Sequence, residues 1–443
     1  MRRFAAGIRA GERSRRVYEG TGAFSDGENF NMPRGSAQAA GAGAMKALPM
    51  TDDERAAWWA LAATRSLTPA ALRALLAAFG MPQALRSQSF DALAAVAGEA
   101  AARAILAPLP AGWDAQVARV ARWCEQPGNA LVSLADPAYP PALLAMPDPP
   151  PLLYVKGQLE LLHASAIALV GSRNATPQGL EDAAQFAREL AAAGLVIVSG
   201  LALGIDAAAH WGALEVMGHT VAVIGTGIDI VYPLAHRELA QRIASHGALV
   251  SEWPLGTPAR PSHFPQRNRL IAGLAKGVLI VEAALRSGSL ITARLANEMG
   301  RDVFALPGSI HSPLSRGCHR LIKEGARLTE EPAEILEELG LVGMARSHAD
   351  VAAPGSGAPA TPAVAPAAQA GADARTAPSY AQDSAAARVI AALGHAPATL
   401  EVLARRTDMG GAALQAALLE LELAGHVNAL PGGRFTRTAT RRG

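Results

Sequence analysis

Lysine is scarce in this sequence, and so is charge in general. The sequence contains Lys46, Lys156, Lys276 and Lys323 against 36 arginines, and charged residues make up 18% of the 443 positions. The formal net charge of +2 is too small for a histone-like, diffusely basic surface. The arginine bias has two interpretations. It reflects a GC-rich genome, or it serves phosphate binding, which suits a guanidinium fork better than an ammonium group.

Cysteine and long apolar runs are also nearly absent. Cys124 and Cys318 lie far apart, which excludes a disulfide framework and a Cys-x-x-Cys metal site. No run of about 18 apolar residues is without charge or proline, so we expect no transmembrane helix. Arg2 and Arg3 are followed by no apolar segment of the kind that a signal peptide needs. We therefore expect a cytoplasmic protein with reduced thiols and no membrane insertion.

Composition divides the chain into five segments. Residues 1–44 are rich in Gly, Ser and Arg and lack a hydrophobic period, which predicts a disordered extension. Residues 346–382 consist mainly of Ala, Pro and Gly, which predicts a linker. Hydrophobic periodicity marks the other three segments, residues 45–148, 149–345 and 383–436, which we expect to be folded domains.

Short helices are predicted in residues 45–148. Thr51 and Glu54 have the spacing of a capping box, and later helices are expected over residues 91–107 and 116–126. The pattern is typical of a small helical domain of the sterile-alpha-motif (SAM) or helix-hairpin-helix kind, which often lies beside nucleic acid. Plain helical packing without a DNA contact explains the same residues.

An α/β domain is predicted in residues 149–345. Short apolar runs, rich in β-branched residues, alternate there with amphipathic segments. These runs are Ala166–Val170, Leu195–Val198, Thr220–Ile224, Ala248–Val250, Val278–Val281 and Val303–Leu306. Continuous apolar strands between helices indicate a parallel sheet covered on both faces. We therefore predict an extended Rossmann-like fold with a doubly wound, mostly parallel sheet.

A winged helix is predicted in residues 383–436. Helical patterns over residues 384–393, 399–404 and 412–424 precede a hairpin pattern over residues 426–436. This order is that of a winged-helix domain, a variant of the helix-turn-helix. The third helix contains no Arg or Lys, so it offers little chemistry for reading a DNA groove. A regulator that binds duplex DNA through this domain is therefore disfavoured.

Small residues and an arginine follow several predicted strands. Gly171-Ser172-Arg173 follows the first strand, Ser199-Gly200 the second and Ser287-Gly288 the fifth. Ligands of a doubly wound sheet bind at the carboxyl ends of its strands. Small residues at helix starts, together with an arginine, favour a phosphate there. A capped turn explains each loop equally well, but their convergence indicates a phosphate-bearing ligand.

Aromatic and basic residues gather after the fourth strand. Phe264, Arg267, Asn268 and Arg269 lie within six residues at a helix start. Arginines neutralise phosphates, and an aromatic face stacks on an unpaired base, which contributes roughly 1–3 kcal/mol per base. In a purely structural interpretation, the arginines form ion pairs with the glutamates that follow the fourth and fifth strands, and the phenylalanine is a hydrophobic plug.

Motifs for common cofactors and for catalysis are missing. The first strand is not followed by Gly-x-Gly-x-x-Gly, and no Gly-Lys-Ser/Thr loop occurs, so we expect neither NAD nor ATP nor another cofactor. His210 and His263 are candidates for acid–base chemistry, although core or capping roles are commoner. Asp206 could bind a metal or a ribose, although helix capping is its commoner use. Glu252 and Glu282 lie at strand ends without an evident nucleophile.

Eight motifs occur in order along residues 149–330. They are Val170-Gly-Ser-Arg-Asn, Val198-Ser-Gly-Leu-Ala-Leu-Gly-Ile-Asp206, Gly225-Thr-Gly-Ile-Asp229 with Tyr232-Pro233, Ser251-Glu252, Phe264-Pro-Gln-Arg-Asn-Arg269, Val281-Glu-Ala283, Ser287-Gly-Ser-Leu-Ile-Thr-Ala293 and Leu306-Pro-Gly308. Together they closely resemble the DprA/Smf family, the DNA-processing proteins of natural transformation. The likeness extends weakly over the helical and winged-helix segments, which that family often has.

The resemblance implies a protein without catalytic activity that binds single-stranded DNA. It would protect incoming strands, load the RecA recombinase onto them and form a homodimer through its Rossmann-like domain. The residues that the resemblance places in or along a phosphate pocket are Gly171, Ser172, Arg173, Ser199, Gly200, Arg267, Asn268 and Arg269, with Phe264 stacking a base. Relatives often carry a Lys three residues before that Phe, where this chain has Pro261 beside Arg260.

A second hypothesis is an enzyme that hydrolyses a nucleotide or a sugar phosphate. Phosphoribohydrolases that resemble lysine decarboxylases have a related Rossmann-like fold and carry a Pro-Gly-Gly-x-Gly-Thr stretch. This chain has Ser287-Gly-Ser-Leu-Ile-Thr in the equivalent place. The missing glycines favour the DNA-binding hypothesis.

The distribution of charge sharpens that hypothesis. Residues 1–44 contain seven arginines and four acidic residues, so the rest of the chain has a net charge of −1. A DNA-binding protein of this composition must obtain its affinity from a local cluster of arginines and helix-start amides, doubled in a dimer.

Overall fold

The computed structural model describes six stretches of the chain. These are residues 45–64, 67–109, 112–341, 384–393, 397–430 and 433–438. The expected disordered extension of residues 1–44 and the expected linker of residues 346–382 lie outside the described residues. Within the described stretches, every helix falls short of the length and apolarity that a membrane crossing requires.

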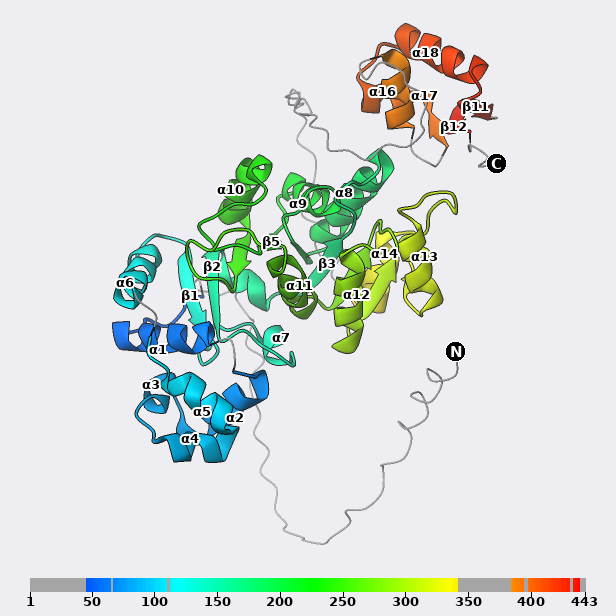
Figure 1. Cartoon of the computed structure of the whole chain (residues 1–443). Helices are drawn as coiled ribbons and strands as arrows, with labels where there is room; N and C mark the ends of the chain where they lie inside the picture. Colours follow the sequence, from blue (N-terminus) through cyan, green and yellow to red (C-terminus); the bar gives the residue numbers. More distant parts are fainter. Residues whose placement is uncertain are drawn as a thin grey trace, which may run out of the picture. The chain divides into compact units, whose positions relative to one another are not determined.

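A nine-stranded sheet forms the centre of the α/β region (Figure 1). Its strands are β1 (Asn129–Ser133), β2 (Leu152–Gly157), β3 (Ala166–Val170), β4 (Val196–Ser199), β5 (Thr220–Val223), β6 (Ala248–Ser251), β7 (Gly277–Ile280), β8 (Asp302–Ala305) and β9 (Arg327–Leu328). They lie in the order β1-β2-β6-β5-β4-β3-β7-β8-β9. The pairs β1–β2 and β2–β6 are antiparallel, and the other six are parallel. The predicted fold class is confirmed, and the six expected strands are β3 to β8.

The order of the strands reverses beside β3. From β3 the chain adds β4, β5 and β6 on one side, then crosses over and adds β7, β8 and β9 on the other. Parallel pairing of β3 with β7 brings the loops after both strands to the same edge of the sheet. Such a reversal leaves a crevice between the diverging loops, and it is where ligands of doubly wound sheets bind.

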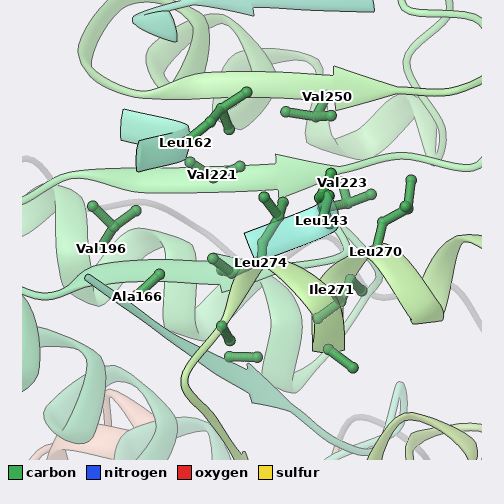
Figure 2. Close-up of a cluster of buried hydrophobic side chains, with 14 of the residues drawn as sticks. Leu143, Leu162, Ala166, Val196, Val221, Val223, Val250, Leu270, Ile271 and Leu274 are labelled. Carbon is green, nitrogen blue, oxygen red and sulfur yellow. The ribbon is translucent and has the colours of Figure 1, made fainter. Parts of the chain in front are cut away.

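Helices cover both faces of the sheet, and Figure 2 shows a cluster of buried side chains on one of these faces. The helices of the α/β region are η1 (Leu159–His163), α7 (Pro141–Leu144), α8 (Pro177–Ala192), α9 (Ile205–Glu215), η2 (Leu234–His236), α10 (Arg237–His246), α11 (His263–Leu274), α12 (Ser289–Glu298), α13 (Arg316–Lys323) and α14 (Pro332–Glu338). Val223 and Val250 pack against Leu143 of α7 and against Leu270 and Ile271 of α11 on this face. The position of α11 is therefore fixed by the core.

The opposite face is covered by α8, α9 and α14. Ile167 and Leu169 of β3 pack there with Phe186 of α8 and Ile205 of α9, while Ala168 points to the first face. This alternation is the period of two that a strand requires. Both faces of β3 are consequently apolar, which explains its uninterrupted hydrophobic run.

The N-terminal helices follow the sequence patterns with one exception. They are α1 (Asp52–Ala63), α2 (Pro69–Phe79), α3 (Pro82–Leu85), α4 (Phe90–Ala97), α5 (Glu99–Leu106) and α6 (Trp113–Cys124). The capping box is present, because Thr51 Oγ1 accepts from the amide of Glu54 while the Glu54 carboxylate accepts from the amide of Thr51. The single helix expected over residues 91–107 was wrong. Gly98, with φ at 85°, breaks it into α4 and α5.

Two unexpected strands join the N-terminal segment to the sheet. β1 follows α6 and pairs with β2, so the sheet takes a strand from residues 45–148. Trp123 of α6 packs edge-on against Tyr154 of β2, with ring centroids 5.9 Å apart. Arg119 of α6 forms an ion pair of 2.6 Å with Asp229, in the loop after β5. The division into separate domains at residue 148 remains a prediction, but this edge of the sheet is shared by both segments.

The C-terminal residues form the predicted winged helix. Helices α16 (Ala385–Ala392), α17 (Leu400–Thr407) and α18 (Gly411–Leu423) surround a core of their own. Strands β10 (Ala398–Thr399), β11 (Val427–Leu430) and β12 (Arg434–Arg437) form a small sheet in the order β10-β12-β11.

Close packing of α8 on α9 makes Gly212 sensitive to substitution. A Cβ atom at Gly212 would collide with the carbonyl oxygen of Ala184 on α8. We expect Gly212→Ala to lower the free energy of unfolding by about 1–3 kcal/mol, despite the better helix propensity of alanine. Thermal and urea unfolding measure the effect. Gly411→Ala is the control, because no atom lies within 4 Å of its added methyl group. Equal stability of both variants would contradict the close approach of the two helices.

Candidate nucleic-acid interface

A crevice of about 530 Å³ opens where the strand order reverses. It lies between the loops after β3 and β7 and the first turns of α11 and α12. The predicted site residues that line it are Gly171, Ser172, Arg173, Phe264, Arg267, Asn268, Ser287 and Gly288. Ser199, Gly200 and Arg269 are not among its lining residues. The structure thus brings together residues that are up to 117 positions apart.

Arg173 and Phe264 are paired at the crevice. The Cζ atom of Arg173 lies 5.3 Å from the centre of the Phe264 ring, which is a cation–π contact. Arg173 is exposed and Phe264 is half-buried. The loop beneath is held by the Ser172 hydroxyl, which accepts from the amide of Asn174 at 3.2 Å. A cation is therefore held over an aromatic ring at the edge of the sheet.

Gly171 serves the packing of its loop. A Cβ atom there would lie 2.6 Å from Cγ1 of Ile205 and 2.9 Å from the carbonyl oxygen of Glu282. The loop after β3 can therefore approach α9 and the end of β7 closely with a glycine at this position. The glycine beside Ser172 and Arg173 is therefore explained by packing.

Arg267 lines the crevice but is only 4% exposed. Its guanidinium donates to the carbonyl oxygens of Gly200, at 2.5 Å, and of Val223, and its Nε donates to Asn268 Oδ1 at 3.0 Å. Burial lowers the pKa of Arg267 to about 10, while the nearby Asp206 carboxylate raises it. The side chain stays protonated at neutral pH and ties the ends of β4 and β5 to α11.

Arg269 points away from the crevice. It forms ion pairs with Glu252 and, at 3.1 Å, with Asp148, and it donates to the carbonyl oxygen of Asp148 at 2.7 Å. Burial raises the pKa of Glu252, and the charge of Arg269 opposes this shift. The structural alternative, an ion pair with Glu252, therefore describes Arg269, and a DNA contact by Arg269 remains a prediction.

Ser199 and Gly200 hold the loop after β4. The Ser199 hydroxyl donates to the carbonyl oxygen of Leu169 at 2.6 Å. The buried Asp206 carboxylate accepts from the amides of Gly200, at 3.1 Å, and of Ala202, at 3.3 Å. Burial raises the pKa of Asp206, and the charge of Arg267 opposes this shift. Asp206 thus organises the start of α9, and contacts of Ser199 or Gly200 with DNA remain predictions.

The N-terminus of α8 already accommodates an anion of the protein. The Glu282 carboxylate accepts from the Thr176 amide at 2.9 Å and from the Thr176 hydroxyl at 2.6 Å. A carboxylate is favoured at this positive end of a helix. The N-cap residue of α8 thus binds a carboxylate of the protein itself, and a ligand phosphate at this helix start remains a prediction.

Arg286 was missed as a site residue. It is exposed and lines the crevice next to Ser287 and Gly288. The signal was present in the sequence, since Arg286 precedes the Ser-Gly pair in the loop after a predicted strand. With Arg173, it gives the crevice two exposed guanidinium groups from the two loops that diverge at β3 and β7.

The two histidine candidates lie outside the crevice lining. His210 is fully buried on α9, where its Nδ1 lies 2.7 Å from the Thr220 hydroxyl. The Thr220 hydroxyl itself donates to the carbonyl oxygen of Ile197, so it accepts from His210. His263 stacks on Trp253 with ring centroids 3.6 Å apart. Both side chains serve packing.

Comparison with known proteins agrees with this architecture. Residues 130–340 match the family described as DNA recombination-mediator protein A, and residues 362–433 match the DprA winged helix domain. Protein Smf of Escherichia coli (strain K12) is 44% identical over 323 residues, which cover 70% of this chain and 78% of the relative. The chain belongs to the DprA/Smf family. DNA processing protein DprA of Streptococcus pneumoniae is 49% identical over 206 residues, covering 46% of this chain and 73% of the relative.

A solved DprA structure shares the fold. The X-ray structure of DNA processing protein A from Streptococcus pneumoniae matches with a TM-score of 0.56 and 38% identity, covering 66% of this chain and 99% of the solved chain. The resemblance of the ordered motifs to the DprA/Smf family is thus confirmed. Arg260, which stands beside Pro261 where relatives often carry a lysine, is exposed and lines a separate hollow that contains Trp253 and Arg269.

The role assigned to Arg267 predicts a loss of stability. We expect Arg267→Ala to lower the free energy of unfolding by about 3–5 kcal/mol, because the Gly200 and Val223 carbonyls and Asp206 lose their buried partner. Urea unfolding measures the change. Arg173→Ala is the control and should unfold like the parent protein, because Arg173 is exposed. A stable Arg267→Ala variant would refute the bracing role.

His210 predicts a dependence of stability on pH. Burial lowers the pKa of His210 to about 3, whereas an unfolded histidine has a pKa near 6.5. Below pH 6.5 the unfolded state therefore binds a proton that the folded state does not, and stability falls as the pH falls from about 6.5 toward 3. We expect His210→Gln to show a shallower decline of Tm between pH 6.5 and pH 4. An identical slope in the two proteins would show that His210 is not held neutral.

Proposed function

We propose that this DprA/Smf family member binds single-stranded DNA in the crevice. The observation that carries the proposal is the exposed Arg173 guanidinium over the Phe264 ring, 5.3 Å from its centre, where the strand order reverses. A phosphate binds Arg173 and Arg286, and the attached base stacks on Phe264. Stacking needs an unpaired base, so the arrangement selects single strands over duplex DNA.

Recognition is largely independent of sequence in this proposal. Every base offers a π-face to an aromatic ring, and phosphates carry no sequence information. Binding to single strands weakens with salt by about 0.7 in log affinity for each log unit of salt and each phosphate neutralised. Two exposed arginines in the crevice therefore favour a modest salt dependence.

The carboxylates at the edge of the sheet support binding over hydrolysis. Glu252 is paired with Arg269, Glu282 accepts from Thr176, and Asp206 accepts from backbone amides. Glu252 and Glu282 also lie outside the lining of the crevice. Incubation with nucleoside monophosphates tests the alternative enzyme, and release of free base would support it.

The biological role follows the family. We propose that the protein protects incoming single strands in natural transformation and loads RecA onto them in the cytoplasm, as a homodimer through the Rossmann-like domain. The name of the Streptococcus pneumoniae relative, DNA processing protein DprA, supports the DNA-processing part of this role. Sedimentation equilibrium measures the mass of the assembly.

Substitution of Arg173 is the central test of the proposed function. We expect Arg173→Ala to weaken binding of a dT oligonucleotide about tenfold or more, because a charge-assisted contact with a phosphate is lost. The salt dependence should fall by about 0.7 per log unit. Fluorescence anisotropy at several salt concentrations, with dT and mixed sequences, measures both quantities.

The control is an arginine away from the crevice. Arg188 on α8 is half-buried, lies outside the crevice lining and is paired with Glu215, so Arg188→Ala should bind like the parent protein. Equal binding by the parent and Arg173→Ala would show that the phosphate site lies elsewhere.

A further inference from the structure

The ring of Phe264 has a second aromatic neighbour, Tyr232. The two ring centroids are 5.6 Å apart, with an angle of 40° between the ring planes. Tyr232 lies between β5 and η2, so it comes from a different loop than the residues that line the crevice. Arg173, Phe264 and Tyr232 thus form a continuous group of one guanidinium and two rings.

Tyr232 is more exposed than we expect for an aromatic residue that serves packing alone. Tyr232 is 49% exposed, although an aromatic side chain contributes most to stability when it is buried. Leu234, on the same loop, is 71% exposed, and Leu203, in the loop after β4, is 46% exposed. These two loops are joined, because His236 Nδ1 lies 2.9 Å from the carbonyl oxygen of Leu201. The two joined loops therefore both carry exposed apolar side chains.

We propose that Tyr232 is a second stacking surface, which receives the base next to the one on Phe264. The inference rests on the proposed function and extends it from one nucleotide to two. A nucleobase fits this surface because it is flat and largely apolar on its faces, and because the phosphate site at Arg173 adjoins the same pair of rings. Bases in a duplex are stacked about 3.4 Å apart, so rings 5.6 Å apart suit a strand whose bases have been separated.

The test separates stacking from support of Phe264. Tyr232→Leu keeps an apolar side chain beside Phe264 but removes the π-face, and Tyr232→Phe keeps the face. We expect Tyr232→Leu to bind a dT oligonucleotide about 5- to 50-fold more weakly, as the loss of one stacked base implies, and Tyr232→Phe to bind like the parent protein. Anisotropy measures affinity, and thermal unfolding must show that both variants are folded.

A backbone without bases provides the decisive comparison. On an oligonucleotide of equal length made of abasic sites, the parent protein and Tyr232→Leu should bind equally, because no base is present to stack. An equal loss on both oligonucleotides would mean that Tyr232 merely supports the phosphate site, and would overturn the inference.

A measurement on the parent protein removes dependence on the variants. Irradiation of a complex with oligonucleotides that contain 5-iodouracil should cross-link both Phe264 and Tyr232, as mapped by mass spectrometry. A cross-link at Phe264 without one at Tyr232 would overturn the inference and leave the proposed function intact. Failure of the parent protein to bind dT, or normal binding by Arg173→Ala, would instead overturn the proposed function.

Discussion

The interface depends on one buried cation, the guanidinium of Arg267. Burying a charge is costly unless its donors are satisfied, and here the carbonyl oxygens of Gly200 and Val223 accept from it while Asp206 lies nearby. These contacts fix the first turn of α11 against the ends of β4 and β5. Phe264 lies three residues earlier on the same side of that helix, so the brace that holds Arg267 also positions the stacking ring.

The same edge of the sheet shows why a nearly neutral chain can present a positive crevice. Glu252 forms an ion pair with Arg269, and the Glu282 carboxylate accepts a hydrogen bond from Thr176 at the start of α8. The carboxylates that follow the strands are therefore engaged by the protein, whereas Arg173 and Arg286 remain exposed. The potential felt by a ligand depends on which charges are left uncompensated at the surface, and much less on the total.

Hydrophobic pattern predicted most of the fold, and the expected strand topology predicted where the candidate crevice lies. The strands β3 to β8 are apolar on both faces, so their runs are visible without structural information. β9 has two residues and is defined by its pairing with β8, which leaves no pattern to detect. Arginine roles were harder to assign, because the partners of Arg269, namely Glu252 and Asp148, lie 17 and 121 residues away. The sequence reveals a cation but not whether the protein itself supplies the anion.

An interface of this kind balances two contributions that respond differently to their surroundings. The proposed phosphate contacts of Arg173 and Arg286 would weaken as salt rises, whereas the proposed stacking on Phe264 would depend little on salt and would be lost when bases are paired. A polybasic surface would hold duplex and single strand alike through their phosphates. The proposed interface has few cations and an aromatic face. Discrimination between single strands and duplex DNA would therefore come from the ring, because a base can reach it only after leaving the duplex. Under the proposed function, the scarcity of positive charge is itself a means of selecting single strands, because it prevents non-specific phosphate binding from outweighing the contribution of the base.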